Sequence, residues 1–128
     1  MQIGIDLGAT KIEYVLLDNN NIELKRDRVQ TPKDYENTII SITEIVKKLE
    51  NKSRKFNVGI CHPGAVDKTT GLIKNAHNSQ WLNKRNLIKD LKLIYLEENL
   101  IKHLICFVLV FLLFFLLKFY PLNFAVIS

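Results

Sequence analysis

The chain has 128 residues, with 18 Lys and Arg against 13 Asp and Glu and a formal net charge of +5. That length suffices for one modest domain and is too short for a typical two-domain enzyme. The basic residues are scattered in pairs and are not interleaved with aromatic side chains, so no nucleic-acid partner is expected. Cys61 and Cys106 lack the spacing of metal ligands, and each is expected to be a buried, reduced thiol.

Charge and glycine are distributed unevenly along the chain. Every Asp and Glu precedes His103, and Lys118 is the only charged side chain after it. Every glycine lies at or before Gly71, whereas most phenylalanines lie after His103. The composition therefore averages two unlike segments. The first segment begins directly with a strand pattern, so no signal peptide is expected.

Three strands are predicted in the first 30 residues. Residues 2–7 (QIGIDL) alternate apolar and polar side chains and end at a glycine turn. Residues 12–17 (IEYVLL) are β-branched and aromatic enough for a second strand, and residues 22–29 (IELKRDRV) alternate again. Residues 18–21 (DNNN) favour a turn between these two. Three strands joined by short turns predict an antiparallel meander.

A helix and a further strand follow the meander. Residues 35–51 place their apolar side chains at helical spacing, directly after the break at Thr31-Pro32. Residues 56–61 (FNVGIC) predict a short buried strand. Residues 66–75 predict a hairpin-like turn, and residues 87–102 a second helix. The order indicates an α/β fold, with helices packed on a mixed sheet.

The stretch GIDLGATK, from Gly4 to Lys11, has the residue types of a phosphate site. Glycine lets backbone N–H groups approach a phosphate closely, and Asp6 can hold the water shell of Mg²⁺, which prefers oxygen ligands. Thr10 and the N–H groups of residues 8–11 can face phosphate oxygens, while Lys11 either neutralises phosphate or caps the second strand. Taken alone, the pattern is equally typical of an ordinary glycine-containing hairpin turn.

Four segments stand in a characteristic order within residues 1–91: "MQIGIDLGATKIEYVLLD", "TPKDYENTI", "VGICHPGAVDKTTGLIKNAHNSQWLN" and "KDL". Together they resemble the N-terminal lobe of the ROK family of sugar kinases, in its fructokinase and N-acetylglucosamine kinase branch. The resemblance implies a ribonuclease-H-like (actin-like ATPase) fold, with ATP and Mg²⁺ as cofactors. It implies transfer of the ATP γ-phosphate to a hexose hydroxyl. The wording "KNAHNSQWLN" favours a fructokinase-like member.

The resemblance also assigns residues to sites. It places the nucleotide on Asp6, Gly8, Ala9, Thr10 and Lys11, with Asp6 as the metal ligand. It places the sugar near Gly64, Asn75, Asn78 and Ser79. Loop Asn and Ser residues, however, more often bond their own backbone than a ligand. In residues 75–86, an ordered loop, Trp81 is expected to be a packing anchor, and Ala9 and His62 depart from the family pattern.

The same resemblance predicts that this chain is inactive. Phosphoryl transfer to a sugar needs a base near the accepting hydroxyl. The family supplies it from an Asn-Asp-Ala-Asn segment shortly after "KDL", yet no Asp follows Asp90. No catalytic residue is assigned, and the family's zinc loop and second ATP-binding lobe are absent. A truncated or frameshifted cytoplasmic kinase fragment is therefore expected.

The C-terminal tail, residues 92–128, is expected to lie outside the family pattern. Residues 104–117 are 14 uninterrupted apolar side chains, short of the roughly 20 that span a bilayer. Extension through residue 127 reaches that length but includes Lys118 and Pro121. An apolar C-terminal helix that is a frameshift product is favoured, and a membrane anchor or a buried core helix are the alternatives. The rival function is a membrane-tethered, non-catalytic nucleotide- or sugar-binding module.

Overall fold

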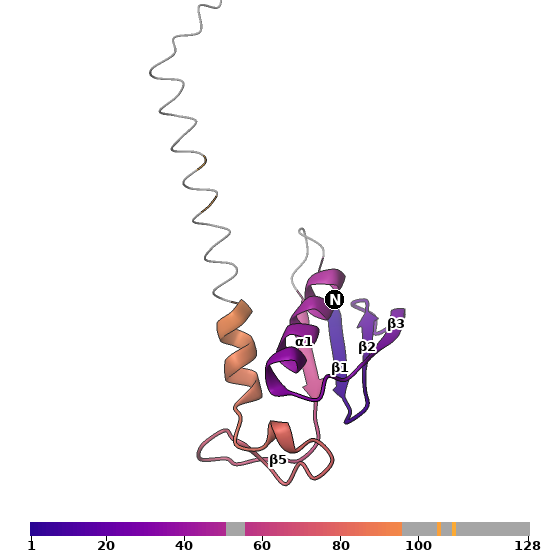
Figure 1. Ribbon diagram of the computed structural model, residues 1–128. Coiled ribbons are helices and arrows are strands. Elements are labelled where there is room, and N and C mark those ends of the chain that lie inside the picture. Colours follow the sequence, from indigo (N-terminus) through magenta and orange to yellow (C-terminus); the bar gives the residue numbers. More distant parts are fainter. Residues whose placement is uncertain (51–55, 96–104, 106–108, 110–128) are drawn as a thin grey trace, which may run out of the picture. The chain divides into compact units, whose positions relative to one another are not determined.

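The computed structural model describes residues 1–50, 56–95, 105 and 109. The chain divides into two units, Met1–Leu91 and Lys92–Ser128, and each is described by itself. The first unit contains these elements in chain order (Figure 1): β1 (Gln2–Leu7), β2 (Lys11–Leu17), β3 (Glu23–Gln30), α1 (Tyr35–Leu49), β4 (Asn57–Cys61), β5 (Ala65–Val66), β6 (Ile73–Lys74) and the 3₁₀ helix η1 (Gln80–Leu82). Residues 87–95 are helical and continue into the second unit.

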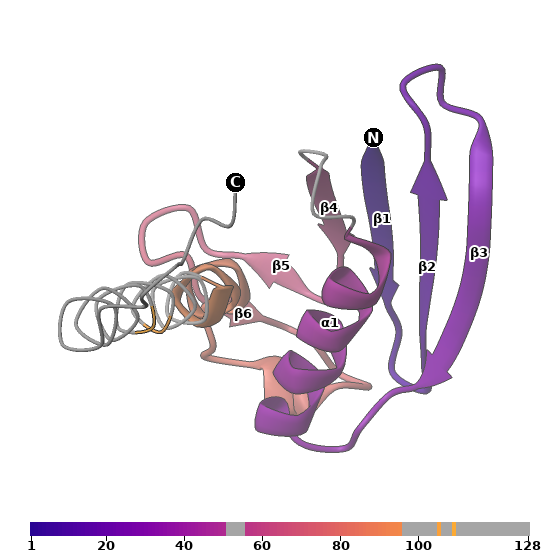
Figure 2. The ribbon, with the colours of Figure 1, turned by 90° about the horizontal axis from the view of Figure 1, so that it is seen from above.

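Four strands form one mixed sheet in the order β3-β2-β1-β4 (Figure 2). β1, β2 and β3 are successive antiparallel neighbours, whereas β4 returns after α1 and pairs parallel with β1. In this register Asp6 lies between Glu13 of β2 and Cys61 of β4. The predicted meander and returning strand are confirmed, with strand ends that differ from the predicted ones by at most one residue. The predicted burial of the returning strand is wrong: β4 is exposed except at half-buried Ile60, because it lies at the edge of the described sheet.

Helix α1 lies across one face of this sheet (Figure 2). The helix begins after Asp34, whose carboxylate accepts the N–H of Asn37 at 2.8 Å and so caps the first turn. The apolar side chains facing each other between helix and sheet are buried, and burial stabilises each by about 1.5–3 kcal/mol. This core comprises Ile3, Ile5, Leu7, Ile12, Tyr14, Ile39, Ile42, Ile45, Val46 and Leu49.

The opposite face of the sheet is polar, because successive residues of a strand point to alternate faces. Asp6 and Lys11 are exposed there, and Glu13 is half-buried. A depression of about 270 Å³ on this face is lined by Gly4, Ile5, Asp6, Glu13, Tyr14, Val15 and Arg26. The sheet thus packs its core on one side only within the part of the chain that the structure describes.

Cys61 corrects one prediction from the sequence. The side chain was expected to be buried, but it is exposed and free. β4 is the last strand of the described sheet, and the register places Cys61 beside Asp6, on the face away from α1. An apolar sequence predicts a strand, but only the elements that pack beside the strand decide which of its side chains are buried. Cys106 lies outside the described residues.

The second predicted helix is confirmed for residues 87–95, and its continuation to residue 102 lies outside the described residues. Of the tail, residues 92–128, only residues 92–95, Ile105 and Leu109 are described. The three interpretations of residues 92–128 therefore stay predictions. Among the residues that the structure describes, no helix combines the length and apolar character needed to cross a membrane.

Candidate functional site

The turn between β1 and β2 is closed by its own backbone. The N–H of Gly8 donates to the carbonyl oxygen of Lys11 at 2.9 Å. A Cβ on Gly8 would lie 2.8 Å from that oxygen, closer than real Cβ atoms come to a backbone atom, so the turn requires glycine. The N–H of Gly8 is thus used within the turn, whereas the sequence predicted that it could face phosphate oxygens. Within the described residues, the N–H groups of Ala9 and Thr10 have no acceptor.

The segment after β3 holds this turn in place. Thr31, which is 1% exposed, donates its N–H to the carbonyl of Thr10 at 3.0 Å and its hydroxyl to the carbonyl of Gly8 at 2.8 Å. The ammonium of Lys33 donates to the carbonyl of Ala9 at 2.8 Å. All three carbonyls of residues 8–10 are therefore occupied. An approaching anion is repelled less by carbonyls that already accept hydrogen bonds, while the tip N–H groups remain available.

Asp6 lies at the end of β1, directly before the turn, and its side chain is exposed. Its partner in the β1–β2 register is Glu13, whose carboxylate is bound to Lys11 at 3.0 Å. The hydrogen bond and the charge of Lys11 hold the pKa of Glu13 below its ordinary value. Lys11 therefore neutralises Glu13, and Asp6 keeps a carboxylate that a cation can approach from solvent.

These residues fit a magnesium-bound polyphosphate. Mg²⁺ binds proteins through one or two carboxylates and keeps several of its waters, and exposed Asp6 provides such a ligand. The tip N–H groups of Ala9 and Thr10, with the exposed hydroxyl of Thr10, provide donors for phosphate oxygens. In the described part of the chain, no three His, Cys, Asp or Glu side chains gather into a metal cluster. The arrangement thus suits a metal carried by its phosphate ligand.

The four predicted sugar-side residues lie between β4 and η1. Gly64 has a φ of +83°, and a Cβ there would lie 2.6 Å from the carbonyl of Lys74, so backbone geometry alone explains this glycine. Asn75 also has a positive φ, of 60°, and is exposed, as is Asn78. Ser79 is 1% exposed and precedes η1. Of the four, Asn75 and Asn78 present side chains that a ligand could reach.

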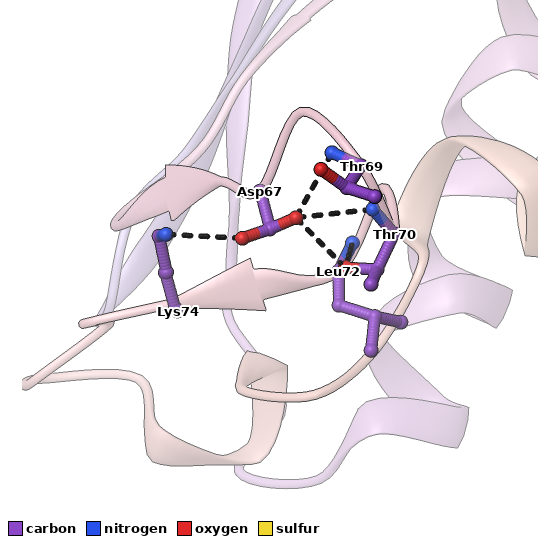
Figure 3. Close-up of polar contacts among 5 residues, drawn as sticks. All are labelled: Asp67, Thr69, Thr70, Leu72 and Lys74. Carbon is purple, nitrogen blue, oxygen red and sulfur yellow. Dashed lines mark hydrogen bonds and ion pairs between the residues drawn. The ribbon is translucent and has the colours of Figure 1, made fainter.

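The β5–β6 turn is held by one carboxylate, that of Asp67 (Figure 3). One of its oxygens accepts the N–H groups of Thr69 and Thr70 at 2.9 and 3.0 Å, and the other accepts the ammonium of Lys74 at 3.1 Å. The backbone N–H of Thr70, the Lys74 ammonium and the N–H of Thr69 lower the pKa of Asp67 to about 2. All these bonds lie within the hairpin, so Asp67 has a structural role.

Lys33 and Trp81 connect the turn with the loop that precedes residue 87. The Lys33 ammonium, bound to Ala9, lies 5.5 Å from the centroid of the Trp81 ring. The indole N–H of Trp81 is buried and has no acceptor within the described residues. No role was predicted for Lys33 or Thr31 from the sequence. Both lie in the segment TPKDYENTI, and the break at Thr31-Pro32 marks the point where the chain leaves the sheet near the turn.

Comparison with known proteins identifies the relatives of this chain. The pattern of the ROK family matches residues 2–101. An N-acetyl-D-glucosamine kinase of Haemophilus influenzae is 33% identical over 93 residues, and one of Mannheimia succiniciproducens is 37% identical over 93 residues. Each match covers 71% of this chain and 30% of the relative, at its N-terminal part. The chain thus spans about 30% of the length of these curated relatives.

A solved structure shows the same fold. The crystal structure of a ROK family glucokinase from Streptomyces griseus, in complex with glucose and AMPPNP, superposes with a TM-score of 0.61 and 27% sequence identity. The superposition covers 71% of this chain and 29% of the glucokinase. The ROK family match over residues 2–101 covers more than half of the chain. This chain belongs to the ROK family.

Proposed function

We propose that this chain is the nucleotide-phosphate-binding N-terminal part of an ATP-dependent sugar kinase, and that residues 1–128 do not phosphorylate sugar by themselves. The observation that carries the proposal is the turn after β1. It combines an exposed carboxylate at Asp6, a glycine that cannot be replaced at residue 8, and two tip N–H groups beside occupied carbonyls. An anion and its metal are thereby accommodated together.

Each residue of the turn has a separate role in this proposal. Asp6 holds Mg²⁺ through its water shell, and the N–H groups of Ala9 and Thr10 bind phosphate oxygens. Gly8 keeps the turn narrow, and Thr31 orients it from its buried position. When bound, Mg²⁺ neutralises part of the phosphate charge, which favours transfer of the terminal phosphoryl group. Lys11 contributes less, because it is paired with Glu13.

The proposed lack of phosphoryl transfer rests on the carboxylates other than Asp6. A sugar hydroxyl needs a base within hydrogen-bond reach before it attacks phosphorus. Asp67 is held inside its hairpin, and Asp90 accepts the hydroxyl of Tyr35 at 2.7 Å. No Asp follows Asp90 in the sequence. Asp67 and Asp90 are thus structural partners, and neither is proposed as the base.

The proposed acceptor is a hexose, and an N-acetylhexosamine is favoured over fructose. The motif wording favoured a fructokinase-like member, but the two curated relatives named above are N-acetyl-D-glucosamine kinases. Exposed Asn75 and Asn78 carry amide groups that can bond sugar hydroxyls or an acetamido oxygen. Gly64 and Ser79 are proposed to shape this part of the loop by backbone geometry and packing.

Binding and turnover test the two halves of the proposal separately. Calorimetric titration of the full chain with MgATP is expected to show binding that Asp6→Asn weakens by about tenfold or more. Gly8→Ala is expected to weaken it as well, since its Cβ meets a backbone carbonyl. Gly59→Ala is the matched control, because a Cβ there meets nothing within 4 Å. Its affinity should equal that of the unchanged chain.

Turnover is measured with N-acetylglucosamine, fructose and glucose as acceptors. No sugar phosphate above background is expected from the purified chain. Sugar phosphate formation that disappears in Asp6→Asn would contradict the inactive part of the proposal and leave the nucleotide site intact. Failure of the unchanged chain to bind MgATP would contradict the nucleotide site itself.

The second candidate is a membrane-associated binding module without transfer activity. It is favoured by the 14 apolar residues at 104–117, which lie mostly outside the described residues. Flotation of the full chain with phospholipid vesicles tests this candidate, against a chain that ends at residue 91. A frameshift origin of residues 92–128 is tested by translating the gene's other frames, where an Asn-Asp-Ala-Asn segment is expected. A chain that works in the cytoplasm should not float.

A further inference from the structure

We infer that Lys33 is the cation that positions phosphate at the turn after β1, and that it transmits occupancy of this turn to Trp81. This inference rests on the proposed nucleotide site and adds a residue to it. The ligand class is a polyphosphate chain, as in a nucleoside triphosphate. Lys33 is a positioning residue of a binding site. From the sequence, Lys11 was the candidate for neutralising phosphate, with capping of the second strand as the alternative.

Lys11 is poorly available for phosphate. It and Glu13 are two residues apart on β2, so their side chains project from the same face of the sheet. Their ion pair of 3.0 Å is part-exposed, and its energy is small. Its geometric effect is larger, since the ammonium is directed along the open face toward Glu13 and not over the turn.

Lys33 is directed at the turn itself. Its ammonium lies 2.8 Å from the carbonyl oxygen of Ala9, whose neighbour Thr10 carries one of the two tip N–H groups. A lysine ammonium has three donors, and Ala9 occupies one of them. The side chain is exposed, so an oxygen arriving from solvent can reach the ammonium. A phosphate at the tip can therefore be bound by backbone N–H groups and by Lys33 together.

The backbone that carries Lys33 is fixed relative to the turn. Thr31 is buried and bonds to the carbonyls of Gly8 and Thr10. On the other side, Asp34 caps α1 through two bonds to Asn37, at 2.8 and 2.9 Å. Lys33 thus stands between two anchored residues, and its side chain is the part that can move. Such an arrangement limits the conformational freedom lost when the ammonium binds a ligand.

Trp81 lies where it senses the position of this ammonium. The ring centroid is 5.5 Å from the Lys33 nitrogen, within the range of a cation–π interaction. The indole N–H is buried without an acceptor within the described residues, which is an unfavourable state for a polar group. Phosphate that draws the Lys33 ammonium removes a cation from the ring face. The loop holding Asn78 and Ser79 precedes Trp81 directly, so the nucleotide side and the proposed sugar side are connected.

Trp81 is the only tryptophan of the chain, which makes its fluorescence a direct measure of this contact. Inorganic tripolyphosphate with Mg²⁺ is titrated into the full chain while the emission of Trp81 is followed. Calorimetry of the same titration gives the affinity independently. A saturable emission change is expected for the unchanged chain, at the midpoint that calorimetry gives. Orthophosphate should bind more weakly, because it offers fewer oxygens to the tip.

Four variants separate Lys33 from the rest of the site. Lys33→Met is expected to weaken tripolyphosphate binding by about tenfold and to abolish the emission change. Lys33→Arg should restore both, since it keeps the charge. Lys11→Met should retain the emission change and most of the affinity. Lys25→Met, an exposed lysine of β3, is the matched control and should behave as the unchanged chain. Circular dichroism confirms that each variant is folded.

The outcomes distinguish this inference from the function on which it rests. If the unchanged chain binds tripolyphosphate and Lys33→Met binds it equally well, the inference is wrong and the nucleotide site stands. The inference is also wrong if Lys11→Met removes the binding. If the unchanged chain binds neither tripolyphosphate nor MgATP, the proposed function fails and the inference fails with it. If Lys33→Met does not fold, loss of the emission change in folded Lys33→Gln decides the question.

Discussion

At the scale of single residues, Asp67 shows how one carboxylate defines a turn. Its oxygens satisfy two backbone N–H groups and an ammonium, all from residues 69–74 (Figure 3). Such a side-chain turn is local, because Asp accepts from the N–H groups that follow it in sequence. The bonds favour the charged form, and they hold the pKa of Asp67 at about 2, below the ordinary 3.8.

We predict that Asp67 makes stability depend on pH only in acid. Its pKa is lower in the folded chain, so its contribution is complete above about pH 4 and is lost as pH falls through about 2. Urea unfolding of Asp67→Asn should therefore show a lower midpoint than the unchanged chain at pH 5 to 7. This gap should close toward pH 2. In a Lys74→Met background, Asp67→Asn should still lower the midpoint by most of this difference. The N–H of Thr70 lowers the pKa of Asp67 more than Lys74 does. A gap that persists at pH 2 would contradict this origin.

At the scale of elements, one polar cluster links Asp90, in the helical segment that begins at residue 87, to the start of α1. The hydroxyl of Tyr35 donates to Asp90 at 2.7 Å. The guanidinium of Arg85 lies 4.6 Å from the Tyr35 ring centroid and 3.4 Å from the carboxylate of Glu36. Burial, followed by the bond to Asp90, raises the pKa of Tyr35, so the phenol stays protonated and remains a donor. The contact joins residues far apart in sequence.

We predict that Tyr35→Phe lowers the free energy of unfolding by about 1–2 kcal/mol, because it removes a hydrogen bond to a charged acceptor. Amide hydrogen exchange should quicken in residues 87–91. Tyr14→Phe is the matched control, since buried Tyr14 also donates to an aspartate, but over 3.3 Å and to exposed Asp27. Its cost should be smaller. If both variants lower the free energy of unfolding equally, the contact of Tyr35 with Asp90 stabilises the fold no more than that of Tyr14 with Asp27.

At the scale of the molecule, the described sheet ends at β4. No further strand pairs with β4 in the described residues, and Val58 is 43% exposed on it. An exposed strand edge with an apolar side chain favours pairing with another chain. The chain spans about 30% of the length of its curated relatives. By itself, this chain has a β4 edge that favours self-association.

We predict that Val58→Lys raises the protein concentration at which the full chain associates, because a lysine on an edge strand opposes intermolecular pairing. Light scattering across a concentration series measures the effect. Val66→Lys is the matched control: Val66 is 47% exposed, but β5 has only two residues and is too short to pair widely. Equal responses would attribute the association to general charge and not to the β4 edge.

Much of the fold could be predicted because its signals are local. Alternation along β1 and β3 and the helical spacing in α1 each arise within a few residues, and the structure has these elements within two residues of their predicted bounds. The exposure of Cys61 could not be predicted in this way. Whether a strand is central or at an edge depends on which elements pack beside it, and the pattern FNVGIC does not state that.

Some features of the candidate site were likewise predictable from local sequence, and others were not. By itself the sequence determined the glycine-dependent turn and exposed Asp6 at the end of the first strand, because turn geometry depends on adjacent residues. Only the tertiary structure decided that the N–H of Gly8 is used internally, that Lys11 pairs with Glu13, and that Lys33 reaches the turn across 24 residues of chain. The physical reason is that a charged side chain binds whichever partner the fold brings within about 3 Å, and sequence spacing does not encode that distance.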